Sequence, residues 1–243
     1  QKSANMLSQE GLNVVSLPKT IDNDLWGTDM TFGFQSAVDI ATNAIDCIHT
    51  TAASHDRVFI VELMGHKVGW VTLHAGIAGG ADVILIPEIP YNLNHVIEAI
   101  KRRSEQGKGF TILAVAEGAI SKEDAKLSKK QYKERLAQRQ HSTVGYELAA
   151  QIEEATGQEV RVTIPGHMQR GGSPVPFDRV ISSRLGAAAA ELIHNEDYGK
   201  MVIMKGYDIS SIPLKETAGK LKYVSPDDQI VKQAKILGIS FGD

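Results

Sequence analysis

Residues 57–70 read RVFIVELMGHKVGW, a strand-like run that leads directly into a glycine-containing turn. Residues 57–63 are rich in β-branched and aromatic side chains, which favour the pleated surface of a sheet. The run is nearly continuous in apolar residues, so both faces of the predicted strand should be covered. This pattern is typical of a strand in a parallel sheet with helices on both sides.

The same pattern recurs along the chain. Further strand-like runs lie at Asn13–Leu17, Asp82–Ile86, Phe110–Ala116, Val160–Ile164 and Met201–Met204. Helical patterns occupy Phe34–His49, Asn94–Gln106, Ser142–Thr156 and Asp178–Asn195. In the first of these helices, Ala37, Ala41 and Ile45 recur at the spacing of one helix face. The alternation of strands and helices predicts an α/β protein with a largely parallel sheet.

The bulk composition excludes several classes of protein. The 243 residues are 42% hydrophobic and 23% charged, and the formal net charge of −3 gives no footprint for nucleic-acid binding. No apolar run approaches the roughly 18–20 residues that a membrane helix needs. A single cysteine, Cys47, rules out a disulfide framework. We therefore expect a globular enzyme of the reducing cytoplasm.

The residues that follow the predicted strands carry most of the unusual chemistry. These segments are PKTIDND at 18–24, MGHKVGW at 64–70, Pro87-Glu88, Glu117-Gly118 and GHMQRGGSP at 166–174. Ligands of parallel sheets bind where the carboxyl ends of the strands meet their loops. An acid, a base or a glycine turn at five successive strand ends therefore indicates a binding or catalytic site.

Two carboxylates stand close together in the first of these segments. Asp22 and Asp24 admit a purely structural interpretation, because Asp and Asn form tight turns by bonding their own backbone. The functional interpretation is that one carboxylate accepts the proton of an attacking hydroxyl while the other helps to hold Mg²⁺. Lys19 beside them would steady phosphate oxygens during transfer, or would be an ordinary surface lysine.

The segment at 166–174 suits a phosphate cradle. Its glycines let backbone N–H groups approach an anion, while His167 and Arg170 supply further donors. Arg161, in the strand that leads into this loop, would add another positive charge. The alternative is a loop that enters a helix and carries His and Arg by chance. Arg57 begins a strand and, taken alone, reads as an ordinary surface residue.

Taken in order, PKTIDND, MGHKVGW, IPE, VAEG and GHMQRGGSP resemble the 6-phosphofructokinases, and the likeness runs from Gln1 to Asp243. The resemblance implies two Rossmann-like three-layer α/β/α lobes of largely parallel sheet, and a homo-oligomer. It also implies Mg²⁺-dependent transfer of a phosphoryl group from ATP or diphosphate. The acceptor would be the C1 hydroxyl of D-fructose 6-phosphate, and the product would be fructose 1,6-bisphosphate, as in glycolysis.

The resemblance further implies how the lobes divide. Residues 1–33 and 170–218 would belong to the donor-side lobe, and residues 34–169 and 219–243 to the lobe that binds fructose 6-phosphate. Family members place a glycine-rich, GGDG-like segment just before the helix with which this chain begins, and QKSANMLSQEG reads as the inside of that helix. We therefore expect the donor-side lobe to be incomplete at its N-terminus and the chain alone to have little kinase activity.

Site residues carry over from the family motifs one by one. Asp22 takes the position of the catalytic base, Asp24 that of the acidic residue near Mg²⁺, and Thr20 that of a contact to sugar and phosphate. Contacts to the sugar or its 6-phosphate are implied for Met64, Gly65, Glu117, Arg161, His167 and Arg170. Arg57 matches an arginine that reaches the 6-phosphate bound by a neighbouring subunit, so the complete sugar site should require an oligomer.

Two positions depart from the common pattern of the family. His66 stands where many bacterial members have Arg, and a neutral imidazole cannot replace a bidentate guanidinium. Lys19 stands where many ATP-using members have Gly, and Lys there often accompanies diphosphate as donor. A branch of the family that shares the segments PKTIDND and TFGFQ uses ATP. Lys19 alone therefore does not decide between ATP and diphosphate as donor.

An alternative function is a non-catalytic regulatory or sugar-phosphate-sensing subunit of the same fold. The presence of Asp22, Asp24, Glu117, His167 and Arg170 argues against it. A further segment, Ser121–Gln140, is rich in Lys, Glu and Gln and predicts a solvated helix or insertion.

Overall fold

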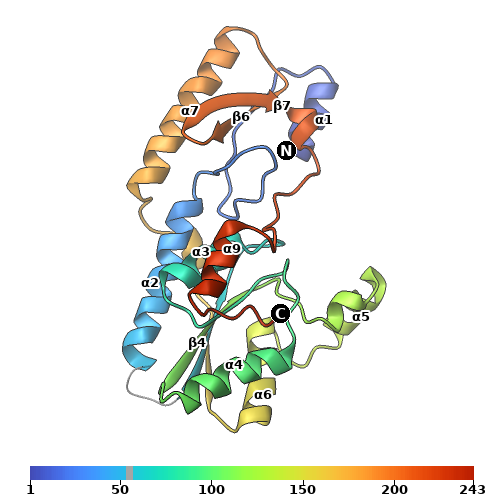
Figure 1. Cartoon of the computed structure of the whole chain (residues 1–243). Helices are drawn as coiled ribbons and strands as arrows, with labels where there is room; N and C mark the ends of the chain where they lie inside the picture. Colours follow the sequence, from blue (N-terminus) through green and yellow to red (C-terminus); the bar gives the residue numbers. More distant parts are fainter. Residues whose placement is uncertain (53–56) are drawn as a thin grey trace. The chain divides into compact units, whose positions relative to one another are not determined.

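The computed structural model describes residues 1–52 and 57–243. Contacts within the chain divide these residues into two compact units. The first unit consists of Gln1–Ala37 and Arg170–Tyr223, and the second unit of Val38–Gln169 and Val224–Asp243. Each unit has a sheet and a hydrophobic core of its own (Figure 1).

A four-stranded parallel sheet, in the order β3-β4-β2-β5, forms the centre of the second unit. Its strands are β2 (Arg57–Leu63), β3 (Val83–Leu85), β4 (Phe110–Ala116) and β5 (Val160–Thr163). The two central strands, β2 and β4, pair along their whole length, from Arg57 with Phe110 to Leu63 with Ala116. In both strands every residue after the first is buried, as the nearly continuous apolar runs predicted.

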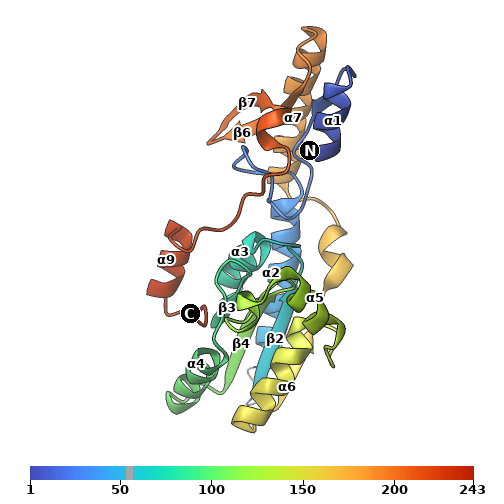
Figure 2. The same cartoon turned by 90° about the vertical axis from the view of Figure 1, so that its right-hand side faces the viewer.

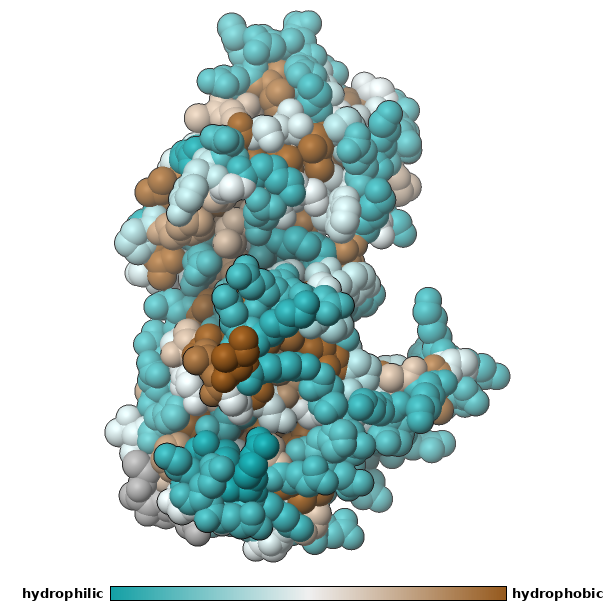
Figure 3. Space-filling model, viewed as in Figure 1, coloured by the Kyte–Doolittle hydropathy of each residue, from teal (hydrophilic) through white to brown (hydrophobic). Residues whose placement is uncertain are grey.

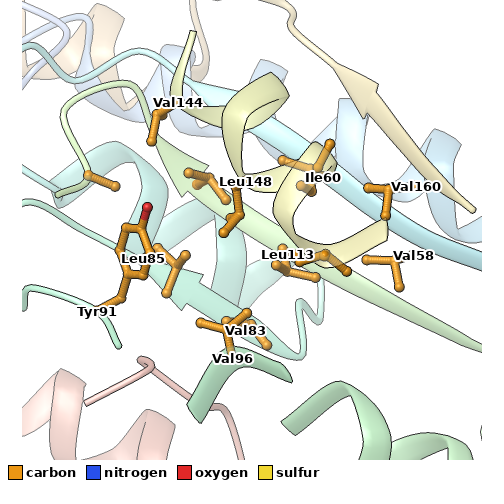
Figure 4. Close-up of a cluster of buried hydrophobic side chains, with 14 of the residues drawn as sticks. Val58, Ile60, Val83, Leu85, Tyr91, Val96, Leu113, Val144, Leu148 and Val160 are labelled. Atoms are coloured by element: carbon orange, nitrogen blue, oxygen red, sulfur yellow. The ribbon is translucent and has the colours of Figure 1, made fainter. Parts of the chain in front are cut away.

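Helices cover both faces of this sheet. The helices of the second unit are the main part of α2 (Phe34–Ala52), together with α3 (Trp70–Ala78), α4 (Leu93–Glu105), α5 (Lys129–Ala137), α6 (Val144–Thr156) and α9 (Gln229–Ile236). On one face, side chains such as Ile60 and Leu113 pack with α4 and α6 around Val96 and Leu148 (Figure 4). On the other face α3 comes so close that a Cβ on Gly76 would lie 2.7 Å from Ile84 Cδ1. The result is a three-layer α/β/α arrangement (Figure 2).

The first unit holds a smaller sheet in the order β1-β6-β7. Its elements are α1 (Lys2–Gln9), β1 (Val15–Ser16), α7 (Pro176–His194), β6 (Lys200–Lys205), β7 (Asp208–Pro213) and α8 (Leu214–Thr217). Strand β6 runs parallel to β1 and antiparallel to β7. Alternate β6 side chains serve opposite faces: Val202 packs with α7, and Met201 packs with α8 and with Ala4 of α1.

The α/β fold with largely parallel sheet is confirmed, but two elements were not predicted from the sequence. Helix α3 was not predicted, because WVTLHAGIA is apolar on nearly every side and has no helical period. Strand β7 was not predicted, because DISSIP has only two large apolar residues. The prediction of a solvated helix or insertion for Ser121–Gln140 is confirmed by α5, which buries none of its residues and has a mainly hydrophilic surface (Figure 3). None of the helices in the described ranges is long and apolar enough to cross a membrane.

A buried carboxylate at the start of α7 holds the start of α2 in the first unit. Asp178 is 4% exposed and accepts hydrogen bonds from Gly33 N at 3.0 Å, Ser36 N at 2.7 Å and Ser36 Oγ at 2.6 Å. Ser36 Oγ in turn accepts a bond from Val175 N at 3.1 Å. These bonds satisfy amides at the N-terminus of α2 that have no partner within the helix.

We expect Asp178→Ala to lower the free energy of unfolding by about 2–4 kcal/mol, because buried amide donors lose a charged acceptor. Urea denaturation measures this change. Asp208→Ala removes an exposed carboxylate in the same unit and should stay within about 0.5 kcal/mol of wild type. Equal stability of the two variants would contradict this account of Asp178.

Candidate functional site

In the first unit, the loop after β1 folds back on itself through buried polar side chains. Asn23 is 3% exposed and has a left-handed φ of 54°, which Asn tolerates better than most residues. Its Oδ1 accepts a bond from Thr31 N at 3.1 Å, and Thr31 Oγ1 donates to Thr20 O at 2.8 Å. Lys19 and Phe32 are therefore bridged as neighbouring strands would be.

This folded loop lines a cavity of about 350 Å³ in the first unit. Its walls are Lys19, Thr20, Ile21, Asp22, Phe32, Gly33 and Arg170. Four predicted site residues are therefore brought together: Lys19, Thr20, Asp22 and Arg170. Two cationic side chains beside one carboxylate can take an anionic group and position a base next to it.

The carboxylate of Asp22 is held by the turn in which it lies. Thr20 Oγ1 donates to Asp22 Oδ2 at 3.2 Å and accepts from Asp22 N at 3.1 Å. This is the local turn chemistry that the structural interpretation of the segment anticipated. It does not compete with the functional interpretation, because it fixes the direction of a carboxylate that lines a cavity.

Asp24 is not among the residues that line this cavity. It is half-buried, and its backbone oxygen accepts a bond from Lys222 N at 2.8 Å. The ammonium group of Lys222 donates to Thr28 O at 3.0 Å and to Asp29 O at 2.8 Å. Burial lowers the pKa of Lys222 to about 8, against an opposing effect of Asp29. No sequence motif surrounds Lys222, so sequence reasoning could not have found it.

A metal ion in this chain would have few protein ligands. Within the described ranges, no group of three or more His, Cys, Asp or Glu side chains is placed to hold a metal ion. Mg²⁺ is often bound by only one or two carboxylates together with phosphate oxygens of a substrate and water. A single carboxylate, which the sequence predicts to be that of Asp24, is within the number of protein ligands that such a site uses.

In the second unit, the turn after β2 is held by a side chain that follows β4. Glu117 Oε1 accepts bonds from Gly65 N at 3.2 Å and from His66 N at 2.7 Å. The turn is tight: a Cβ on Gly118 would lie 2.7 Å from His66 O, and His66 itself has a φ of 56°. The structure therefore brings Met64, Gly65, His66 and Glu117 together at one edge of the sheet.

The η2 helix (Gly166–Arg170) lies beside the same turn. Gln169 is buried, and its Oε1 accepts a bond from Met64 N at 3.0 Å. His167, two residues earlier, is exposed. Gln169 was not among the predicted site residues, although it stands inside the motif GHMQRGGSP. Its position between His167 and Arg170 was the only available signal.

Glu88, in the segment that follows β3, also supports this edge of the sheet in the second unit. Glu88 Oε1 accepts bonds from Gly69 N and Val224 N, both at 3.0 Å. Burial raises the pKa of Glu88, and these hydrogen bonds oppose that rise. Glu88 therefore ties the end of the 64–69 turn to the segment that begins at Val224.

Arg57 and Arg161 lie elsewhere. Both form ion pairs with Glu159, at the amino ends of β2 and β5. Glu117 follows the carboxyl end of β4, and a seven-residue strand separates the two edges by roughly 20 Å. Within the second unit, these arginines are not brought together with the Glu117 turn.

Comparison with known proteins gives consistent matches. The family model described as phosphofructokinase matches residues 1–193. The ATP-dependent 6-phosphofructokinase of Spirochaeta thermophila is 55% identical over 242 residues, which are 100% of this chain and 66% of that relative. The ATP-dependent 6-phosphofructokinase 3 of Bacteroides thetaiotaomicron is 51% identical over 242 residues, covering 100% of this chain and 67% of that relative. The chain thus spans about two thirds of the length of these curated relatives.

A solved structure shows the same fold. The phosphofructokinase of Saccharomyces cerevisiae superposes with a TM-score of 0.72 at 33% identity, over 85% of this chain and 26% of the yeast chain. The family resemblance inferred from the motifs is confirmed by these matches.

The lowered pKa of Lys222 predicts a pH dependence. Between pH 8 and the ordinary lysine value of 10.5, the unfolded chain binds more protons at this site than the folded chain. The free energy of unfolding should therefore rise with pH in that window, and Lys222→Met should lack this rise. Urea denaturation at several pH values measures it, with Lys232→Met, on the exposed side of α9, as the control. Parallel pH profiles for wild type and Lys222→Met would rule out the assignment.

Proposed function

The chain belongs to the phosphofructokinase family, and we propose on that premise that it forms part of an ATP-dependent 6-phosphofructokinase. The reaction is transfer of the γ-phosphoryl group of ATP to the C1 hydroxyl of D-fructose 6-phosphate. The observation that carries the proposal is the cavity in which Asp22 lies with Lys19 and Arg170. A base beside two cations is what the transfer of a phosphoryl group to a hydroxyl requires.

Asp22 is the catalytic base in this proposal. Its carboxylate takes the proton of the C1 hydroxyl as that oxygen bonds to the γ-phosphorus and ADP leaves in line. The hydrogen bond from Thr20 Oγ1 at 3.2 Å keeps the carboxylate in one orientation. Lys19 and Arg170 place positive charge where the transferred group accumulates negative charge. Positioning of this kind can lower a barrier by several kcal/mol.

Asp24 is the candidate for holding Mg²⁺, while Asp22 keeps the role of base. One carboxylate is too few for a complete coordination shell, so the phosphates of ATP and water would supply the other ligands. When bound, Mg²⁺ neutralises charge on the phosphates. Lys222 N donates a hydrogen bond to Asp24 O at 2.8 Å, and this bond keeps this part of the loop in place.

We assign the Glu117 turn and His167 to the sugar. Glu117 Oε1 accepts hydrogen bonds from the amides of Gly65 and His66, which leaves Oε2 as the acceptor for a sugar hydroxyl. Met64 and Gly65 present the backbone of the turn to the ligand. His66 has an exposed side chain, but a neutral imidazole offers a single donor where a guanidinium offers two in parallel. Its contribution to phosphate binding is therefore smaller than that of an arginine.

Arg57 and Arg161 serve a neighbouring copy of the chain in a homo-oligomer. Both lie at the amino edge of the sheet, too far from Glu117 to reach the same sugar within the second unit. Their joint pairing with Glu159 holds them side by side at a surface. A symmetric interface would bring such a pair to the site of the partner copy.

ATP is the proposed donor because the relatives at 55% and 51% identity are described as ATP-dependent. Diphosphate remains the competing donor, because Lys at the position of Lys19 often accompanies diphosphate use in the family. Within this scheme the first unit is the donor side and the second unit the sugar side. Phosphoryl transfer by the intact protein, assayed with each donor in turn, decides between ATP and diphosphate.

Replacing the base should affect turnover far more than binding. We expect Asp22→Ser to lower kcat about 10²–10⁴-fold, because proton transfer loses its acceptor, while the affinity for fructose 6-phosphate changes little. A coupled assay gives kcat and calorimetry gives the affinity. Asp39→Ser, on the exposed surface of α2, is the matched control and should behave as wild type. An Asp22→Ser enzyme with near-normal turnover would refute the assignment.

Mixing two inactive variants tests the shared site. Asp22→Ser lacks the base, and Arg57→Ala lacks the arginine offered to the partner. If Arg57 acts across the interface, a randomly paired mixture should regain about a quarter of wild-type activity, because mixed dimers contain one complete site. Activity that stays at the level of the separate variants after subunit exchange would show that Arg57 acts within its own subunit.

A further inference from the structure

Three consecutive backbone amides of the turn after β2 are bound by side-chain oxygens. Met64 N donates to Gln169 Oε1 at 3.0 Å, and Gly65 N and His66 N donate to Glu117 Oε1 at 3.2 and 2.7 Å. The two acceptors come from different segments, the η2 helix and the end of β4. The turn is therefore held from two sides.

The side chain of Gln169 carries a cost that needs an explanation. It is 1% exposed, and its Nε2 is buried without a hydrogen-bond partner among the described residues. A buried amide donor without an acceptor destabilises the folded state, because it has lost its hydrogen bonds to water. Flipping the amide would turn its NH₂ toward Met64 N–H and set two donors against each other, so the orientation is fixed.

Comparison with other residues explains why a glutamine with an unpaired Nε2 stands at position 169. An apolar side chain of the same length would remove the orphaned donor but would leave Met64 N–H without its acceptor. A glutamate would keep an acceptor but would bury a charge, and a buried charge destabilises the folded state more than an unpaired amide donor does. Glutamine is the neutral residue of this length that supplies an oxygen to Met64 N.

The turn needs this support because of its own conformation. His66 has a φ of 56°, a left-handed value that is unfavourable for a residue other than glycine. A strained turn persists only where its surroundings hold it. Gln169 holds the amide at the start of the turn, and Glu117 holds the amide of His66 itself.

We propose that Gln169 is a positioning residue that fixes the Met64–Gly65–His66 turn against the η2 helix, so that the turn and His167 contact one sugar phosphate. This inference rests on the proposed function. Gln169 touches the turn through Met64 N and acts on the ligand only through it. It therefore controls the affinity for fructose 6-phosphate and leaves the phosphoryl donor unaffected.

Two variants of the intact protein test the proposal. Gln169→Met removes the acceptor and should raise the KM for fructose 6-phosphate about tenfold, while the KM for ATP stays within about twofold. Gln169→Glu keeps an acceptor for Met64 N, so its KM for fructose 6-phosphate should stay closer to wild type than that of Gln169→Met. Its melting temperature should be lower than that of wild type, because the substitution buries a charge. Ile152→Val, in the core of the second unit, is the stability control. It should lower the melting temperature without changing the KM for either substrate.

A measurement on the wild-type protein covers the case in which the variants do not fold. Hydrogen exchange at the amides of residues 64–66 should be slow, because all three are bonded to side chains. Rapid exchange at Met64 would overturn the proposal. An unchanged KM for fructose 6-phosphate in a folded Gln169→Met enzyme would also overturn it. A wild-type protein that does not bind fructose 6-phosphate would instead refute the proposed function, and slow exchange at Met64 would then still support the contact itself.

Discussion

The parallel pairing of β2 with β4 determines where the chemistry of the second unit lies. Leu63 is paired with Ala116, so the next residues of both strands, Met64 and Glu117, leave the sheet side by side. Glu117 can then bind the amides of the turn that β2 feeds. A shift of one residue in this register would move the carboxylate by about 3.3 Å and turn it to the opposite face of the sheet. The contacts of the turn therefore depend on a pairing made by buried apolar side chains.

In the first unit the comparable constraint is polar. Asn23, Thr31 and Thr20 are linked by hydrogen bonds that fold the loop after β1 back on itself. Asp178 then anchors the end of that loop to α7 through Gly33 N. The charged groups of the cavity stand on a backbone whose shape is set by neutral side chains and one buried carboxylate.

Much of the fold could be predicted because the apolar runs of β2 and β4 are long and nearly continuous. Asp22, Thr20, Lys19 and Arg170 could be placed in one site because they stand in distinctive segments after strands, and the structure gathers them around one cavity. Lys222, Asp178 and Gln169 could not be assigned in the same way. Each acts through a backbone amide or carbonyl, and a sequence does not show which backbone groups lie nearby. The positions of Arg57 and Arg161 depend on strand direction in the folded sheet.

Glu159 binds two guanidinium groups at once, and this arrangement has an electrostatic consequence. The three side chains together carry a single positive formal charge, so this surface does not display two uncompensated cations. A dianion that approached this surface would have to compete with a carboxylate already in contact with both arginines. The arginines would be held in place by Glu159 beforehand, so capture of the dianion would exchange one anionic partner for another without ordering two long flexible side chains.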